Sequence, residues 1–178
     1  VQEEVETDVA NLEAWTGHNL RSMAYPFGNT NRAIAELVGE HGITNARTVK
    51  DMHGYGLPDD PLRWHPTCHD SKVKQHLDTY LKLAPKEPTL LYVWGHSWEF
   101  KDQVRWKNMV QFCERIGKQR DIWYTGCGDY TAYLEAMNRV KREEKHLVNP
   151  PDNAPVWVLA AEGPVVLQPG SRMLLADL

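Results

Sequence analysis

Strand-like apolar runs alternate with helix-like segments through the first 146 residues of the chain. Apolar residues at helical spacing, ended by Gly17, come just before a strand-like run at residues 20–25. The order then repeats, with helical patterns at 33–38, 73–84, 106–116 and 130–140 and strand-like runs at 43–49, 90–94 and 121–125. Parallel strands need long, usually helical, connections, so this alternation predicts an α/β fold with a parallel sheet or barrel. These strands are too few to close a barrel, so we expect further strands upstream of Val1.

The last part of the chain has a different pattern. Short β-rich pieces at 156–161, 165–167 and 173–175 are separated by turns that contain Pro and Gly. We therefore predict a small C-terminal β appendage at residues 147–178, after a larger domain at residues 1–146.

Composition narrows the classes of partner. The formal net charge is -4, and Lys and Arg are dispersed among acidic residues rather than gathered in a stripe. This argues against a nucleic-acid partner. No apolar segment approaches the length of a bilayer crossing, so we expect no transmembrane segment. The 3 cysteines lack the paired spacing of a zinc ribbon and are expected to be free thiols.

The apolar run at residues 90–94 ends in Gly95, His96, Ser97 and Trp98. In α/β enzymes the chemistry lies at the carboxyl ends of strands, which makes His96 the first catalytic candidate. The alternative is a histidine held in the sheet by a backbone hydrogen bond. We favour the functional interpretation, with Trp98 as a flat wall suited to a sugar ring.

A second candidate is the turn Tyr25-Pro26-Phe27-Gly28, which follows a predicted strand. Pro and Gly can fix the direction of free amide N–H groups there, and such groups can stabilise an oxyanion. Taken alone, however, Pro and Gly are common in any turn.

The third candidate lies in a long loop at residues 50–71, a length typical of functional loops. Trp64, His65, Cys68, His69 and Asp70 come close together there, and the two histidines, the thiol and the carboxylate could bind a transition metal. Pro66 opposes the helical geometry that lets two histidines share one ion. Contact with a substrate is therefore the favoured interpretation of this segment.

Four segments together resemble the polysaccharide deacetylase (NodB-homology) family over residues 1–146. They are Met23-Ala24-Tyr25-Pro26-Phe27-Gly28, Ala46-Arg47-Thr48-Val49, Trp94-Gly95-His96-Ser97-Trp98-Glu99-Phe100 and Asp121-Ile122-Trp123-Tyr124. The resemblance implies a distorted (β/α) barrel, incomplete here, in a metal-dependent hydrolase. Its substrate would be an acetylated polysaccharide or oligosaccharide, its cofactor a divalent metal, zinc being expected, and its location secreted or periplasmic.

Carried over by position, the resemblance implies that His96 is the general acid and that the backbone N–H of Phe27 is an oxyanion donor. The aromatic side chains of Tyr25, Trp64 and Trp98 are assigned to substrate binding.

The chain departs from the family in its metal ligands. The family's first motif, an Asp pair, and its second, H-x-x-x-H, precede the motif at Pro26-Phe27-Gly28 and are not present in that position. We therefore expect the base and the metal ligands on an upstream segment and assign no metal ligand within residues 1–178. His65 and His69 have the spacing of the second motif but follow the third, so we treat this match as coincidence. Ala24 stands where many relatives have Arg.

The leading hypothesis is the carboxyl-terminal part of a glycan deacetylase that is inactive by itself. One alternative is a catalytically inactive carbohydrate-binding module. Another is a different hydrolase with its own metal at His65, Cys68 and His69.

Overall fold

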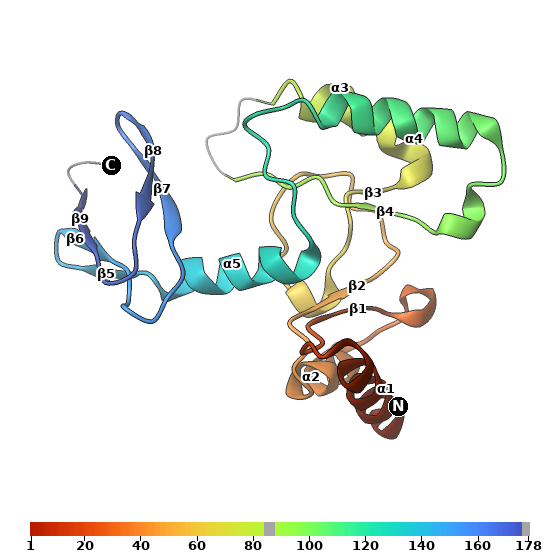
Figure 1. Cartoon of the computed structure of the whole chain (residues 1–178), viewed down its shortest axis with the longest axis horizontal. Helices are drawn as coiled ribbons and strands as arrows, with labels where there is room; N and C mark the ends of the chain where they lie inside the picture. Colours follow the sequence, from red (N-terminus) through yellow and green to blue (C-terminus); the bar gives the residue numbers. More distant parts are fainter. Residues whose placement is uncertain (84–87, 176–178) are drawn as a thin grey trace. The chain divides into compact units, whose positions relative to one another are not determined.

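The computed structural model describes residues 1–83 and 88–175, which form a mixture of helices and small sheets. Two compact units are present, Val1–Tyr124 and Thr125–Leu178 (Figure 1). Within the described ranges no sheet closes into a barrel. The boundary expected between residues 146 and 147 falls inside a strand, and the compact units divide instead between Tyr124 and Thr125.

The first unit alternates helices with short strands. Its helices are α1 (Gln2–Thr16), α2 (Arg32–Glu40), α3 (Val73–Tyr80) and α4 (Gln103–Ile116). Its strands are β1 (Ser22–Ala24), β2 (Asn45–Arg47), β3 (Cys68–His69) and β4 (Val93–Trp94). Single 3-10 turns are η1 (Pro26–Gly28), η2 (Pro61–Arg63), η3 (Asp70–Lys72) and η4 (Ser97–Glu99).

The strands of this unit pair in parallel, as predicted. β1 pairs with β2, and β3 pairs with β4. Trp64 connects the two pairs, because it forms a parallel bridge with Arg47. Its N–H donates to the Ala46 carbonyl at 2.9 Å, and its own carbonyl accepts from the Thr48 N–H at 2.9 Å. The carboxyl ends of all four strands therefore lie toward one edge.

A small apolar core supports this arrangement. Tyr25, Val38, Ile43 and Ala46 are buried together. The side chains packed against them come from α1, the loop after it, β1, α2 and η2: Val5, Val9, Leu20, Met23, Ile34 and Leu62. Gly17 ends α1 in the left-handed conformation (φ 70°), as its place in the pattern predicts.

Two strand predictions were wrong. Residues 121–125 form no strand, and the side chains of Trp123 and Tyr124 there are more than half exposed. β3 lies inside the segment expected to be a loop. A strand of two residues has no periodic pattern to detect, and its partner lies 25 positions away, since Cys68 pairs with Val93.

The second unit contains α5 and the predicted β appendage. α5 (Cys127–Arg139) leads into β5 (Lys141–Glu143), β6 (His146–Val148), β7 (Val156–Ala160), β8 (Gly163–Leu167) and β9 (Arg172–Leu174). The order β5-β6-β9 forms one antiparallel sheet, and β7 and β8 form an antiparallel hairpin. Asn149 is buried between them, where its amide group donates to the carbonyls of Ala154 and Leu167 at 3.0 and 2.8 Å.

None of the helices in the described part of the chain has the length and apolarity that a membrane crossing would need. The cysteines Cys68, Cys113 and Cys127 are free, as expected.

Candidate functional site

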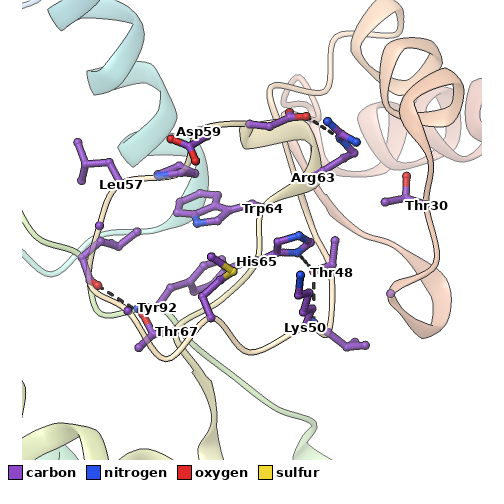
Figure 2. A pocket seen from close by; sticks show the side chains of 18 of the residues that line it. Thr30, Thr48, Lys50, Leu57, Asp59, Arg63, Trp64, His65, Thr67 and Tyr92 are labelled. Carbon is purple, nitrogen blue, oxygen red and sulfur yellow. Dashed lines mark hydrogen bonds and ion pairs between the residues drawn. The ribbon is translucent and has the colours of Figure 1, made fainter.

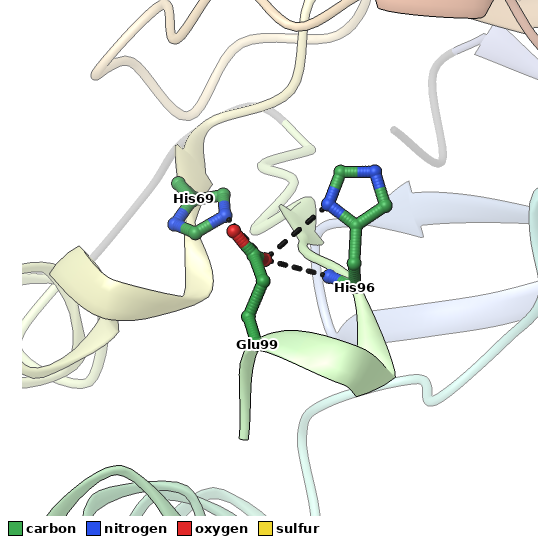
Figure 3. A group of neighbouring side chains, drawn as sticks. All are labelled: His69, His96 and Glu99. Carbon is green, nitrogen blue, oxygen red and sulfur yellow. Dashed lines mark hydrogen bonds and ion pairs between the residues drawn. The ribbon is translucent and has the colours of Figure 1, made fainter. Parts of the chain in front are cut away.

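Two histidines and a glutamate meet at the carboxyl ends of β3 and β4 (Figure 3). His69 is the last residue of β3, and His96 follows β4 after one glycine. η4 then turns the chain back so that Glu99 reaches the His96 backbone, whose N–H donates to Glu99 Oε2 at 3.0 Å. A 3-10 turn is short enough to bring residues three apart onto one side. Local chain geometry therefore places Glu99 beside His96.

One oxygen of Glu99 connects the cluster. Glu99 Oε2 lies 3.1 Å from His69 Nε2, 3.3 Å from His96 Nδ1 and 3.3 Å from Arg105 Nη2. Figure 3 shows the second ring nitrogen of His96 pointing away from this carboxylate. Burial by itself would raise the pKa of Glu99, but hydrogen bonds from the His96 backbone and the His69 ring hold that pKa below its ordinary value.

His69 is held from its other side. Its Nδ1 lies 2.9 Å from Ser71 Oγ and 3.1 Å from Asp70 Oδ1. The Asp70 side chain is only 3% exposed, and Arg105 binds both of its oxygens, Nε to Oδ2 at 3.2 Å and Nη2 to Oδ1. A bidentate pair of this kind fixes the orientation of both groups. Asp70 and Arg105 thus hold the His69 ring against Glu99.

Aromatic rings surround the two imidazoles. The Trp94 ring stands edge-on to His69 and His96, with centroids 4.6 and 5.6 Å apart. Its Nε1 donates to Asp51 Oδ1 at 2.9 Å, which anchors the ring. Trp98 stacks on His96 with centroids 5.1 Å apart, and 64% of it is exposed. Trp98 therefore offers a flat apolar surface beside His96.

Gly95 allows the close approach of the β4 end to Asp70. A Cβ at Gly95 would lie 2.9 Å from Asp70 Cγ and 3.1 Å from Asp70 Oδ1. Because Asp70 is buried and held by Arg105, it cannot move aside easily.

We expect Gly95→Ala to lower the free energy of unfolding by about 2 kcal/mol, the cost of overpacking a fixed site. Gly56→Ala is the matched control, because no atom lies within 4 Å of its added Cβ. Its effect should stay within about 0.5 kcal/mol. Urea denaturation of both variants measures the difference, and equal midpoints would show that Asp70 yields freely.

The cluster has the donor set of a transition-metal site. Nε2 or Nδ1 of each histidine and an oxygen of Glu99 lie within 4.8 Å of one another. Among the described residues, no other group of three or more His, Cys, Asp or Glu side chains has its ligand atoms this close together. It does not include His65 or Cys68, so the structure does not bring together the alternative metal site at His65, Cys68 and His69.

A separate pocket of about 880 Å³ lies next to η1 and the 48–67 segment (Figure 2). Phe27, Trp64 and His65 all line it. His65 Nδ1 lies 2.5 Å from Thr48 Oγ1. Burial, with the nearby charges of Lys50 and Arg63, lowers the pKa of His65. His96 is not among the lining residues, so this pocket does not unite the two predicted catalytic positions.

Phe27 has the backbone expected of a special turn. Its φ is 56°, in the left-handed region that residues other than glycine rarely adopt, and its ring is 90% exposed. The neighbouring backbone amides already donate hydrogen bonds: the Tyr25 N–H donates to the Arg47 carbonyl, and the Gly28 N–H donates to the Tyr25 carbonyl. Among the described residues the Phe27 N–H donates to no backbone or side-chain acceptor. It is available to a ligand, as an oxyanion donor must be.

The three aromatic residues predicted to bind substrate lie in three different environments. Tyr25 belongs to the core, and its hydroxyl donates to the Leu62 carbonyl at 2.7 Å, so packing accounts for this residue. Trp64 is 3% exposed but contributes to the wall of the pocket. Trp98 is open to solvent beside His96.

Sequence reasoning assigned no role to Glu99 or Arg105, and it considered Asp70 only as a possible metal ligand in the loop segment at residues 64–70. The signal for Glu99 was present, because a glutamate three residues after the N-cap residue, here His96, is the spacing of a capping box. Nothing local identifies the Asp70 and Arg105 pair, whose members are 35 positions apart.

Cys68 lies directly before His69, and burial raises the pKa of its thiol to about 11. Thiolate is the reactive form, so Cys68 should resist alkylation at pH 8 while exposed Cys113 reacts. Iodoacetamide labelling followed by peptide mass spectrometry measures both rates. We expect Cys68 to be labelled only after denaturation, and labelling of the folded protein at the Cys113 rate would contradict its burial.

Compared with known proteins, the chain matches no family model, no curated protein and no solved structure.

Proposed function

We propose that this chain is the carboxyl-terminal part of a polysaccharide deacetylase, which hydrolyses N- or O-acetyl groups on a glycan. In this proposal β1 to β4 belong to a distorted (β/α) barrel. The observation that carries the proposal is the arrangement of His96, which stands at a strand end with one ring nitrogen on Glu99 and the other directed away. Its position agrees with the motif resemblance at residues 94–100.

His96 serves as the proton donor in this reaction. Hydrolysis breaks the bond from the acetyl carbon to nitrogen or oxygen, and the departing amine or alkoxide needs a proton. With Nδ1–H donating to Glu99, the imidazolium of His96 can release its Nε2 proton to the leaving group and become neutral. The Glu99 carboxylate fixes the orientation of the ring through its contact with Nδ1. Glu99 is thus a positioning residue for the acid.

Phe27 has the complementary role. Attack on an acetyl carbon converts its carbonyl oxygen into an oxyanion, which a preorganised amide donor stabilises. The free N–H of Phe27 suits this role. η1 follows β1 and His96 follows β4, so both groups leave parallel strands at the same edge. A substrate lying across that edge could meet both.

The metal that the family uses does not find its usual ligands among these residues. His65 and His69 have the H-x-x-x-H spacing, but the His65 ring bonds Thr48 and the His69 ring bonds Glu99. They therefore do not act as a pair. We assign the activation of water to no residue of this chain, and place the base and the family's metal ligands on sequence before Val1.

Glycan binding by the chain itself tests the first half of the proposal. We expect calorimetry with a chitin hexamer or an acetylated xylan oligomer, in chelator, to show binding that Trp98→Ala weakens at least about 10-fold. Trp15→Ala is the control, since Trp15 is 79% exposed on α1. Equal binding by the two variants would remove Trp98 from the site, and no binding of either glycan would contradict the proposal.

The second part of the proposal, hydrolysis with a base and metal ligands on an upstream segment, is tested on the gene and on its complete product. The reading frame before Val1 should encode an Asp pair and an H-x-x-x-H motif, and a start codon directly before Val1 would overturn the proposal. In the complete protein, His96→Ala should lower kcat for acetate release by about 10²- to 10⁴-fold. Glycan binding without acetate release would instead identify a binding module.

A further inference from the structure

We propose that His69, His96 and Glu99 form a binding site for a divalent transition ion, with zinc the best match, separate from the family's own metal. The ligand atoms would be His69 Nε2, His96 Nδ1 and a carboxylate oxygen of Glu99. Imidazole nitrogen with carboxylate oxygen is a set that zinc binds in proteins. No residue of this set belongs to the motifs that hold the metal in the deacetylase family.

The spacing of the donor atoms supports the site. Bonds of about 2.0 to 2.2 Å in a tetrahedral site place neighbouring ligand atoms about 3.4 Å apart. Glu99 Oε2 lies 3.1 Å from His69 Nε2 and 3.3 Å from His96 Nδ1. The two nitrogens lie within 4.8 Å of each other. Small side-chain rotations would therefore complete the three-ligand geometry.

The outer contacts of His69 are those of a metal-bound imidazole. A histidine that binds an ion through one nitrogen usually donates from the other to a carboxylate or hydroxyl. His69 Nδ1 faces Asp70 Oδ1 and Ser71 Oγ, and Asp70 is buried and fixed by Arg105. These contacts hold Nε2 toward Glu99 without the help of any ion.

The site is also accessible. The side chains of His96 and Glu99 are 42% and 18% exposed, so an ion can enter from solvent. Three protein ligands leave a fourth position for water. Arg105 opposes binding, since its Nη2 lies 3.3 Å from Glu99 Oε2 and an arriving cation must compete with this contact. We therefore expect a site weaker than a structural zinc site.

Occupancy has a consequence for the proposed deacetylase, and this consequence alone rests on the proposed function. A His96 ring that binds an ion through Nδ1 no longer donates to Glu99 and no longer exists as the imidazolium that supplies the proton. Excess metal should therefore inhibit acetate release. The binding itself requires no catalytic activity.

Binding of Co²⁺ to the 178-residue chain, stripped with chelator and free of any tag, tests the site. We expect one ion per chain, with visible absorption of a low-symmetry Co²⁺ centre and displacement by Zn²⁺. His69→Ala and Glu99→Gln should each weaken binding at least about 10-fold. Glu99→Gln keeps the size of the side chain, so it reports on the site even if His69→Ala disturbs the fold.

His65→Ala is the matched control, because His65 lies outside the cluster, and its variant should bind like the wild type. Loss of binding in His65→Ala, or a thiolate-to-cobalt band from Cys68, would overturn the site and support His65, Cys68 and His69 instead. Unchanged affinity in Glu99→Gln and His69→Ala, or no stoichiometric binding, would also overturn it. Glycan affinity in chelator is measured separately, so failure here does not imply failure of the deacetylase proposal.

Discussion

Replacing Gly28 with alanine should lower the free energy of unfolding by about 3 kcal/mol, through a collision added to backbone strain. The φ of Gly28 is +72°, which a residue with a Cβ adopts at a cost. The new Cβ would also lie 2.5 Å from Val49 Cγ2 and 2.6 Å from the Val49 backbone nitrogen. A backbone atom cannot rotate away, so η1 must move. Equilibrium denaturation in urea measures the effect.

The Gly42→Ala variant separates the cost of backbone strain from the cost of the collision. Its φ is +86°, but no atom lies within 4 Å of an added Cβ, so Gly42→Ala carries strain alone. We expect a loss of about 1 kcal/mol there. A Gly28→Ala variant no less stable than Gly42→Ala would mean that η1 moves freely against Val49. If the proposed function holds, displacement of η1 should also reduce acetate release, since Phe27 precedes Gly28.

Asn149→Ala should destabilise the second unit by about 3 kcal/mol. The Asn149 amide donates to Leu167 and Ala154, and its oxygen accepts from Asn153 Nδ2 at 2.7 Å. Asn149 has no exposed surface, so removing its side chain leaves two carbonyls without this donor in a region that water reaches poorly. Each buried group left unpaired costs about 1 to 3 kcal/mol.

Asn138→Ala is the control in the same unit, because Asn138 is an exposed residue of α5. Its effect should stay within about 0.5 kcal/mol. Hydrogen exchange of the amides of β7 and β8 reports on this unit specifically, and we expect faster exchange in Asn149→Ala only. Equal exchange in both variants would show that the hairpin does not depend on Asn149.

Local signals explain what could be predicted from the sequence. The end of α1 at Gly17 depends on one left-handed residue, and the hairpin of β7 and β8 depends on the turn before Pro164. His96 was placed at a strand end because the apolar run stops there. Such features are encoded within a few neighbouring residues, which a single sequence displays directly.

The features that could not be predicted from the sequence are contacts between residues far apart in the chain. β3 exists because Cys68 and His69 find partners in β4, and the Asp70 and Arg105 pair joins η3 to α4. Glu99 could have been found from the turn that follows His96, but its contact with His69 spans 30 positions. The predicted site therefore included His96 without the side chains that orient it.

The bridge between Trp64 and Arg47 determines how the β1-β2 pair and the β3-β4 pair are placed relative to one another. Phe27 lies in η1, which follows β1, and His96 follows β4, while the backbone hydrogen bonds of Trp64 connect the two strand pairs. A change of one position in the register of Trp64 against Arg47 would shift β3 and β4 together relative to β1 and β2, and so change the separation of the proposed acid and the proposed oxyanion donor. The spacing of these two proposed groups would then depend on strand register at the bridge between the two strand pairs.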